Sequence, residues 1–294
     1  MGDSALGPKP TKAYKNSDFL MTRDARDIRV LCEQRETETR LDDNGIKGTV
    51  LFFGSARSKT KAQFAAKLEA MKAAGEDTTR FAKTEWMCDV HENLTSLAEK
   101  VGTFLKTEEF KHVGILTGGG PGMMEAANQG AFSAIPERSI GMGISLPFEP
   151  SLNPFVTPDL AFEFHYFFTR KFWMVLQAMA LVVAPGGVGT MDELFEVMTL
   201  QQCGKIKIKF PIILFGKEYW EKVVNWDFMV ERGVVSQVDV DALFFTDSVD
   251  DAYSMIVESL KHQLASVGFG PKGAAAPAPP AGSPLVPRAP RDPN

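Results

Sequence analysis

Cysteine is scarce in this chain of 294 residues, and its three cysteines lie far apart. Cys32, Cys88 and Cys203 include no close pair, so neither a disulfide framework nor a zinc-binding spacing can be built from them. We therefore expect free thiols in a reducing cytosol. Because no cluster of His, Cys and Asp occurs either, the sequence predicts no metal site and no cofactor.

The chain also lacks an excess of positive charge. Its formal net charge is −5 at pH 7, which excludes the global electrostatic footprint of a nucleic-acid-binding protein. A small anionic ligand is not excluded, because a phosphate group responds to local charges and local dipoles.

Long hydrophobic runs are missing as well. The longest, residues 172–184, contains Gln177 and stops at Pro185, whereas a membrane-spanning helix needs roughly 20 apolar residues. The first residues, "MGDSALGPKPTKAYKN", have no apolar stretch of the kind found in signal peptides. We expect a cytoplasmic protein with no membrane partner.

What the chain has is material for a core, since 44% of its residues are hydrophobic. We expect a flexible lead-in over 1–16 and a single Rossmann-like domain over 17–268, with an N-terminal helical extension over 17–44. Eight of the 18 prolines fall after residue 269, so 269–294 is expected to be a disordered Pro/Ala-rich tail. A Pro-rich docking peptide is the alternative for that tail.

Short apolar runs alternate with helical patterns along the domain. Continuous Val/Ile/Leu/Phe runs are typical of strands covered on both faces. Alternation with helices predicts an α/β fold, a doubly wound and mostly parallel sheet of about seven strands flanked by helices. The expected strands are 49–53, 113–117, 140–146, 161–166, 180–184, 211–215 and 243–246. The expected helices are 60–74, 87–105, 120–134, 169–179, 190–202, 217–231 and 250–266.

Three glycine-containing breaks directly follow predicted strands. They are "VLFFGSAR" with Gly54 and Ser55, "ILTGGGPGMMEAANQG" with Gly119 and Gly120, and "LVVAPGGVGTMDELFE" over 181–196. Ligands of such sheets bind beyond the carboxyl ends of the strands, so all three loops are expected at one ligand-binding edge. Neither the G-x-G-x-x-G fingerprint after the first strand nor a P-loop is present, which disfavours NAD enzymes and P-loop NTPases.

The break over 185–190, "PGGVGT", has the features of a phosphate-binding loop. Gly186, Gly187 and Gly189 leave backbone N–H groups unobstructed around Val188, and Thr190 is expected to start the next helix and to add a hydroxyl donor. A helix N-terminus carries unpaired N–H groups and a partial positive charge, so it favours an anion. The alternative is a tight strand-to-helix turn whose glycines serve geometry alone.

Two charged positions near this loop each have two interpretations. Glu193 could close a T-x-x-E capping box with Thr190, or lie beside the sugar of a bound nucleotide. If Thr169 is an N-cap, Arg170 and Lys171 fall in the first helical turn, where cations oppose the helix dipole. An anionic ligand could compensate them, or they could be solvated surface charges.

Several further side chains are candidates with a structural alternative. Glu125 could line the pocket or favour the first turn of a helix, and His165 is expected to be a hydrogen-bonded structural histidine. An aromatic group is expected mainly in the core, with one ring able to stack on a base: Phe162, Phe164, Tyr166, Phe168, Phe172 and Trp173.

The Arg-Lys pair at 170–171, followed by "PGGVGTMDE" at 185–193, resembles the signature of the LOG family, once labelled lysine decarboxylases. That signature is an Arg-Lys pair about fifteen residues before P-G-G-x-G-T-x-x-E, and every fixed position is present. The resemblance covers roughly residues 48 to 262. It implies a nucleotide-binding catalytic domain that cleaves the N-glycosidic bond of a nucleoside 5′-monophosphate, giving a free base and ribose 5-phosphate.

The resemblance also implies roles for single residues. Arg170 and Glu193 match the catalytic positions, the loop 186–190 takes the 5′-phosphate, and Glu149 matches an acidic residue that contacts the nucleotide. A small nucleotide is thus the expected partner, and a homo-oligomer is expected because family members usually dimerise or form larger assemblies. The decarboxylase label finds no support, since no loop supplies a Schiff-base lysine with its own cofactor site.

The chain departs from small members of the family in two ways. Its second loop reads "GGGPGMMEAANQG", and it has a helical insertion over about 60–106 besides the N-terminal extension. The insertion and the extension fit longer bacterial members, for which a plain purine monophosphate such as AMP is a safer expectation than a cytokinin riboside 5′-monophosphate. The alternative function is a non-catalytic carrier of a phosphorylated ligand, because molybdenum-cofactor carriers resemble this fold.

Overall fold

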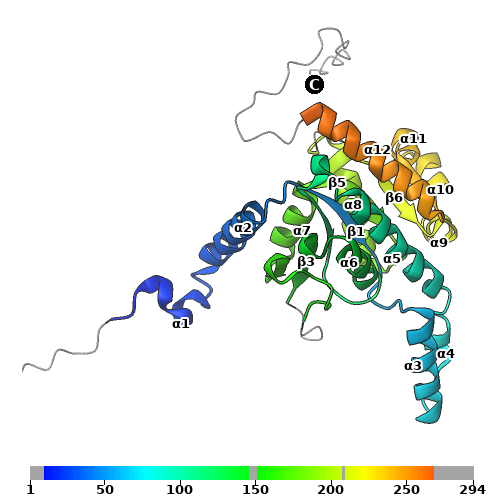
Figure 1. The fold of residues 1–294 in the computed structure, drawn as a ribbon, viewed down its shortest axis with the longest axis horizontal. Coiled ribbons are helices and arrows are strands. Elements are labelled where there is room, and N and C mark those ends of the chain that lie inside the picture. Colours follow the sequence, from blue (N-terminus) through cyan, green and yellow to red (C-terminus); the bar gives the residue numbers. More distant parts are fainter. Residues whose placement is uncertain (1–9, 146–150, 207–208, 268–294) are drawn as a thin grey trace, which may run out of the picture.

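Seven parallel strands form one sheet at the centre of the protein, in the order β4-β3-β2-β1-β5-β6-β7. The computed structural model describes residues 10–145, 151–206 and 209–267. Helices lie on both faces of the sheet (Figure 1), so the doubly wound α/β fold that the sequence predicts is confirmed. The strands are β1 (Gly48–Phe53), β2 (Val113–Thr117), β3 (Ser139–Ile144), β4 (Ala161–Phe164), β5 (Ala178–Val183), β6 (Ile212–Phe215) and β7 (Leu243–Thr246).

Each predicted apolar run overlaps one of these strands, and the observed ends differ from the predicted ones by at most two residues. The predicted end of the third run, Leu146, lies outside the described residues. The agreement has a physical cause. All residues of β1, β2 and β6 are buried, and a strand covered on both faces consists of a continuous apolar run that is easily recognised in the sequence.

The direction of strand addition reverses between β1 and β5. From β1 the chain moves outward through β2, β3 and β4, and it then returns to pair β5 with the other side of β1. In open parallel sheets a crevice forms outside the carboxyl ends of the strands at such a reversal. The loops that follow β1 and β5 flank this point.

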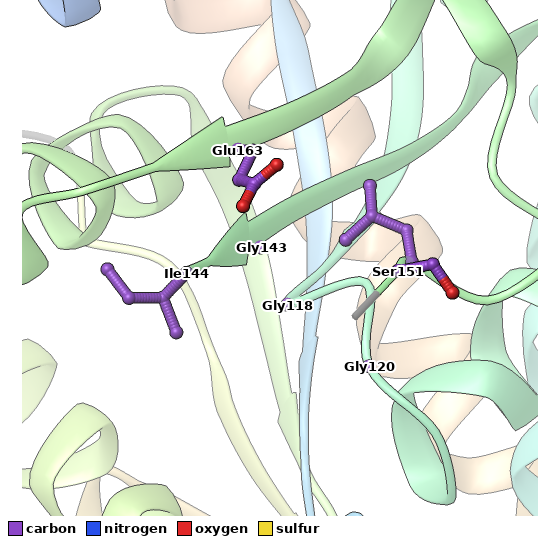
Figure 2. A pocket seen from close by; sticks show the side chains of 7 residues that line it. Gly118, Gly120, Gly143, Ile144, Ser151 and Glu163 are labelled. Atoms are coloured by element: carbon purple, nitrogen blue, oxygen red, sulfur yellow. The ribbon is translucent and has the colours of Figure 1, made fainter. Parts of the chain in front are cut away.

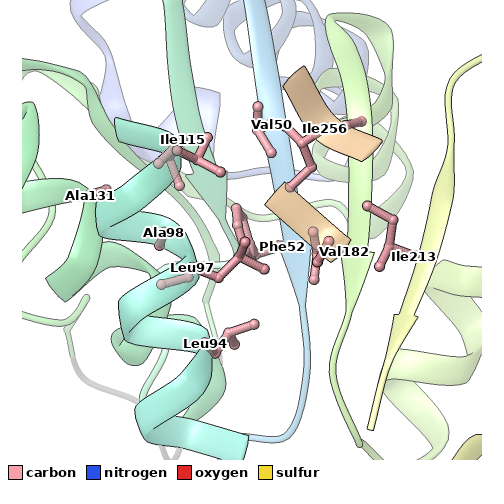
Figure 3. Close-up of a cluster of buried hydrophobic side chains, with 14 of the residues drawn as sticks. Val50, Phe52, Leu94, Leu97, Ala98, Ile115, Ala131, Val182, Ile213 and Ile256 are labelled. Atoms are coloured by element: carbon pink, nitrogen blue, oxygen red, sulfur yellow. The ribbon is translucent and has the colours of Figure 1, made fainter. Parts of the chain in front are cut away.

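Two hydrophobic cores cover the two faces of the sheet. Alternate side chains of β1 divide between them: Val50 and Phe52 face one core, and Leu51 and Phe53 face the other. Figure 3 shows the first core, in which Leu94, Leu97 and Ala98 of one helix pack against the strands together with Ile256 of another. The second core buries three tryptophans, Trp173, Trp220 and Trp226.

Helices of very different lengths connect the strands. The α-helices are α1 (Ser17–Leu20), α2 (Arg26–Asp43), α3 (Lys61–Ala73), α4 (Thr79–Ala82), α5 (Met87–Phe104), α6 (Met123–Ala134), α7 (Phe167–Leu176), α8 (Val188–Gln202), α9 (Lys217–Val223), α10 (Trp226–Glu231), α11 (Gln237–Asp241) and α12 (Val249–Val267). The short 3-10 helices are η1 (Ala13–Lys15), η2 (Glu108–Phe110), η3 (Pro136–Arg138) and η4 (Pro158–Leu160).

Three helix predictions need correction. The extension over 17–44 is two helices, α1 and α2, rather than one. The predicted helix 217–231 is broken into α9 and α10, because the side chain of Asn225 accepts a hydrogen bond from the Phe228 N–H and begins a new helix. The short helix α11, which begins with a capping box at Ser236, was not predicted.

The predicted insertion over 60–106 divides into two parts. Helix α5 is the crossover helix from β1 to β2, and its buried residues Leu94, Leu97 and Val101 belong to the first core. Helices α3 and α4 project from the body of the domain (Figure 1), and only Phe64 is buried among their residues. The true addition to the fold is therefore the segment 61–86.

Two remaining expectations concern the ends of the chain and the cysteines. The predicted tail lies outside the described residues, as does the lead-in except for 10–16, where η1 lies. All three cysteines are free, as predicted, and Cys88 is buried. No helix in the described part of the chain is long and apolar enough to cross a membrane.

Candidate functional site

The three glycine loops meet at the carboxyl edge of the sheet, as predicted. The N–H of Ser55, after β1, donates to the carbonyl of Pro185, after β5, at 3.0 Å. The carbonyl of Ser55 accepts from the N–H of Met123, after β2, at 2.9 Å. Ser55 therefore ties the loops of three adjacent strands together, and the buried Gly54 precedes it.

The loop after β5 leads directly into α8, whose N-terminus is unpaired. Helix α8 begins at Val188, so Thr190 is its third residue and not its first, which corrects the prediction. None of the described residues accepts a hydrogen bond from the N–H groups of residues 187–190. Gly187 and Gly189 have no neighbouring atom within 4 Å of the place where a side chain would begin, and Val188 is 86% exposed. Gly187, Val188 and Gly189 are exposed and Thr190 is buried, so these unpaired donors lie where α8 begins at the protein surface.

Arg170 is held at the centre of the edge by contacts with three elements. It is the fourth residue of α7, which begins at Phe167 and not after Thr169 as predicted. Thr169 lies inside the helix and caps no N–H: its hydroxyl is within hydrogen-bond distance of the Tyr166 carbonyl, at 2.8 Å, and of the Glu33 carboxylate. Arg170 is buried; its Nε donates to the Met142 carbonyl of β3 at 2.7 Å, and its guanidinium lies against Gly118 of the loop after β2.

Arg170 forms a buried ion pair with Glu193 of α8. The Nη1 to Oε1 distance is 3.0 Å, and the two side chains are only 8% and 15% exposed. Burial raises the pKa of Glu193 above its ordinary value, although the Arg170 guanidinium opposes this shift by charge and by its hydrogen bond. The capping-box interpretation is wrong, because the helix begins at Val188 and Glu193 bonds to Arg170 instead of to its own backbone.

Lys171 has no unpaired charge to offer a ligand. Its Nζ lies 2.5 Å from Asp192 and 2.9 Å from Glu196, both on α8. Burial lowers its pKa, but the hydrogen bonds and charges of the two carboxylates outweigh burial, so the pKa of Lys171 is raised. The carboxylates of α8 thus compensate the cations near the start of α7. A ligand is not needed for that purpose, and Lys171 holds α7 to α8.

A buried polar network fixes the loop after β2. The side-chain amide of Asn153 donates to the carbonyls of Gly119 and Gly120, each at 3.1 Å, and to Asn128 Oδ1 at 2.9 Å. Asn128 in turn donates to Ser139 Oγ at 3.0 Å. The sequence analysis missed both asparagines. Asn128, a polar residue among the apolar positions of α6, was the available signal.

A small pocket lies at the ends of β2, β3 and β4 (Figure 2), and one of its lining residues is Gly118, against which the Arg170 guanidinium lies. Glu163 contributes the only ionisable side chain among its described lining residues, and one carboxylate oxygen accepts a hydrogen bond from Ser145 at 2.7 Å. The sequence analysis did not select Glu163, although it is the one charged residue of β4. The lining residues are Gly118, Gly120, Gly143, Ile144, Ser151, Leu152 and Glu163.

Other predicted candidates are placed less directly. Glu125 lies in the first turn of α6, partly exposed, and forms no hydrogen bond or ion pair with any described residue. Glu149 lies outside the described residues. His165 is exposed, and only its backbone N–H donates, to Glu33 of α2 at 2.8 Å; its ring has no hydrogen bond to any described residue, so the expectation of a hydrogen-bonded structural histidine is not met.

The aromatic candidates divide between the core and the surface. Phe162, Phe164 and Trp173 are buried, as the core interpretation predicts. Phe168 and Phe172 are about half exposed on α7. A further aromatic residue, Tyr219 of α9, was not predicted: its hydroxyl donates to the carbonyl of Gly186 at 2.5 Å.

Comparisons with known proteins connect this site to a family. A family model described as "Possible lysine decarboxylase" matches residues 124–256, which include Arg170, Glu193 and the loop after β5. The cytokinin riboside 5′-monophosphate phosphoribohydrolase of Mycobacterium marinum (strain ATCC BAA-535 / M) is 33% identical over 84 residues. That match spans 28% of this chain and 44% of the relative, less than half of the relative's length.

Two solved structures are similar to the chain at low identity. The molybdenum cofactor binding protein of Rippkaea orientalis is 17% identical, with a TM-score of 0.41 over 72% of this chain and 96% of that one. The X-ray structure of TM1055, a structural genomics target, is 18% identical, with a TM-score of 0.41 over 72% of this chain and 99% of that one. Neither adds to what the strand order already establishes. The sequence signature, the matched family model and the phosphoribohydrolase relative all support a relationship of this chain to the LOG family.

Proposed function

We propose that the protein hydrolyses the N-glycosidic bond of a nucleoside 5′-monophosphate, releasing a free base and ribose 5-phosphate. The observation that carries this proposal is the buried Arg170–Glu193 pair beside the unpaired N-terminus of α8. The phosphoribohydrolase relative supports the same reaction class. A purine monophosphate such as AMP is the proposed substrate, and a cytokinin riboside 5′-monophosphate is the second substrate to test.

The N–H groups of residues 187–190 would bind the 5′-phosphate. Four consecutive donors without an acceptor among the described residues lie at the positive end of a helix of 15 residues, so no basic side chain is required. Thr190 supports this role: at the third position of α8 it is only 6% exposed, and its hydroxyl forms no hydrogen bond with any described residue. Anchoring the phosphate would orient the ribose for reaction, which converts binding energy into positioning.

Glu193 would act on the ribose carbon and on water. As the bond from C1′ to the base nitrogen breaks, positive charge develops on the sugar, as in other glycoside cleavages, and a carboxylate stabilises it. A water oxygen then bonds to C1′, Glu193 accepts the water proton, and that proton passes to the departing base. The raised pKa of Glu193 lies closer to neutral pH than that of an ordinary glutamate, and a carboxyl with such a pKa both accepts and donates a proton efficiently.

Arg170 would keep Glu193 in place and assist the leaving base. Three of its contacts are fixed, to Met142, Gly118 and Glu193, so its position is determined before any ligand binds. The paired Lys171 is proposed to position α8 and not to contact the phosphate. Gly119, Gly120 and Glu125 of the loop after β2 would form the opposite wall of the site.

The test is the substitution Glu193→Gln with AMP as substrate. We expect the rate of adenine release, measured by chromatography, to fall by at least about a hundredfold, while calorimetry still detects AMP binding. Glu258→Gln, an exposed glutamate on α12, is the control and should leave turnover unchanged. Undiminished adenine release by Glu193→Gln contradicts the assignment. Binding without base release from any nucleoside monophosphate supports the carrier alternative instead.

We also propose a homo-oligomer. Phe168, Phe172 and Leu176 are spaced by four residues along α7 and are between 47% and 54% exposed. They form an apolar stripe on the helix that carries Arg170. Analytical ultracentrifugation of the full chain tests this, and a monomer at all concentrations contradicts it.

A further inference from the structure

We infer that Tyr219 is a positioning residue that aims the phosphate-binding N–H groups of the loop after β5. The inference rests on the proposed function, because it concerns the loop that would take the phosphate. It assigns a role to α9, a helix outside the predicted site.

Helix α9 holds the end of β5 through two consecutive side chains. The Tyr219 hydroxyl donates to the carbonyl of Gly186 at 2.5 Å, and the Trp220 Nε1–H donates to the carbonyl of Val183 at 3.0 Å. Trp220 is fully buried, so it fixes the start of α9 in the second core. Tyr219, the preceding residue of α9, is thereby held next to the glycine loop, where it bonds to Gly186.

Because of the geometry of the peptide bond, this contact also determines the orientation of a hydrogen-bond donor, the N–H of Gly187. The carbonyl of Gly186 and the N–H of Gly187 belong to the same planar, trans peptide unit, so they point in opposite directions. A hydroxyl that holds the carbonyl toward α9 therefore holds the Gly187 N–H away from α9. The Gly186 carbonyl has no hydrogen bond from any other described donor.

The opposite side of the loop is where a ligand would bind. Gly187 lacks any neighbouring atom within 4 Å of its missing side chain, and its N–H has no acceptor among the described residues. Without the Tyr219 contact, a loop of glycines has many accessible peptide orientations. Orienting the peptide in advance lowers the entropy lost when the phosphate binds.

The ring of Tyr219 is itself held in place. It stacks on Trp86, with ring centroids 5.6 Å apart and an interplanar angle of 20°, and it meets Trp220 edge-on at 5.2 Å. Trp86 lies between α4 and α5, at the end of the projecting segment 61–86. The added segment thus contributes to the site at one point, the face of the tyrosine that holds the loop.

The experiment compares Tyr219→Phe with wild type by calorimetric titration of AMP, ribose 5-phosphate and adenosine. The variant keeps the ring and its stacking on Trp86 and removes only the hydroxyl. We expect the Kd values for AMP and ribose 5-phosphate to rise about fivefold to tenfold, the effect of one neutral hydrogen bond, while the Kd for adenosine is unchanged. Tyr253→Phe, whose hydroxyl has no hydrogen bond with any described residue, is the control and should bind all three ligands as wild type does.

An AMP Kd within about twofold of the wild-type value overturns the inference, as does an equal weakening of adenosine binding. Failure of the proposed reaction can be told apart from failure of this inference. If the wild-type chain binds AMP but releases no adenine, the proposed reaction is wrong, and the Kd values of wild type and Tyr219→Phe can still be compared. A wild-type chain that binds neither phosphate ligand overturns both. If Tyr219→Phe does not fold, Trp86→Leu removes the stacking partner and should raise the AMP Kd by a smaller factor; no change then overturns the inference.

Discussion

The loop after β2 and the loop after β5 are both rich in glycine, but their glycines stand in different surroundings. A side chain on Gly118 would meet Arg170 Nη2 at 2.5 Å, and one on Gly122 would meet the Ser55 carbonyl at 2.4 Å. Gly187 and Gly189 have no atom within 4 Å of that position. Packing explains Gly118 and Gly122 of the first loop. Nothing in the described part of the protein explains those two glycines of the second, which is what close approach of a ligand would require.

Breaking the first loop should have the largest effect on stability. Gly122 has φ of +73°, and the atom nearest to an added side chain is backbone, which cannot rotate away. Gly122→Ala should lower the free energy of unfolding by about 3 kcal/mol, from left-handed strain together with overpacking. Urea denaturation measures this. A loss below about 0.5 kcal/mol, typical of neutral surface substitutions, would remove the contrast between the two loops.

The polar support of the first loop should matter somewhat less. Asn153→Ala removes the side-chain donor to the carbonyls of Gly119 and Gly120; the Gly119 carbonyl keeps the backbone N–H of residue 153, but the buried Gly120 carbonyl is left without a donor among the described residues. We expect a loss of about 2 kcal/mol in the free energy of unfolding. The exposed Asn44, which donates to the carbonyl of Arg40 at 2.8 Å, is the matched control. Asn44→Ala should cost under about 0.5 kcal/mol, and equal losses in both variants contradict the expected network role.

The second loop should respond in the opposite way. Gly189 is the second residue of α8 and has no positive φ, so Gly189→Ala should raise the free energy of unfolding by about 0.5 kcal/mol through helix propensity. The added methyl group would nevertheless occupy the face offered to the phosphate. The AMP Kd should therefore rise about tenfold, or 1.4 kcal/mol, in a titration. Unchanged affinity would show that this glycine serves geometry alone.

Arg170 and Glu193 connect the two loops, and pH gives the most specific test of that connection. The pKa of Glu193 is raised in the folded state, so this group favours folding most below the ordinary glutamate pKa. Its contribution should be lost as pH rises from about 4.3, the ordinary value, through the raised pKa, with a slope no steeper than about 1.4 kcal/mol per unit. Unfolding free energies measured across this window should show the slope in wild type and not in Glu193→Gln. If the unfolding free energies of the two proteins change with pH in the same way, the expected contribution of Glu193 is contradicted.

The sequence was informative wherever burial leaves a continuous pattern. All seven strands were predicted because each is a short apolar run, and the shared loop edge followed from parallel pairing. Arg170 and Glu193 were selected through the family signature and lie together in an ion pair. Helix starts were less predictable: Thr169 and Thr190 both resemble N-caps, but each lies inside a helix that begins two residues earlier.

Residues that reach the site from distant positions could not be found in this way. Asn153 lies 34 residues from Gly119, and Tyr219 lies 33 residues from Gly186. Neither belongs to a local pattern, because a hydrogen bond between two loops leaves no periodic trace in either one. Lys171 shows the same limit, since only the packing of α7 against α8 brings Asp192 and Glu196 to its ammonium group.

By itself the sequence determined the parallel sheet, the succession of strands and helices along the chain and the glycine breaks at the edge of the sheet. Hydrophobic periodicity and the backbone freedom of glycine are properties of residues that are neighbours in the chain. Only the tertiary structure decided which charges are paired, which glycines are crowded and which N–H groups remain free. Those outcomes depend on distances between strands and helices that the chain brings together only when it folds.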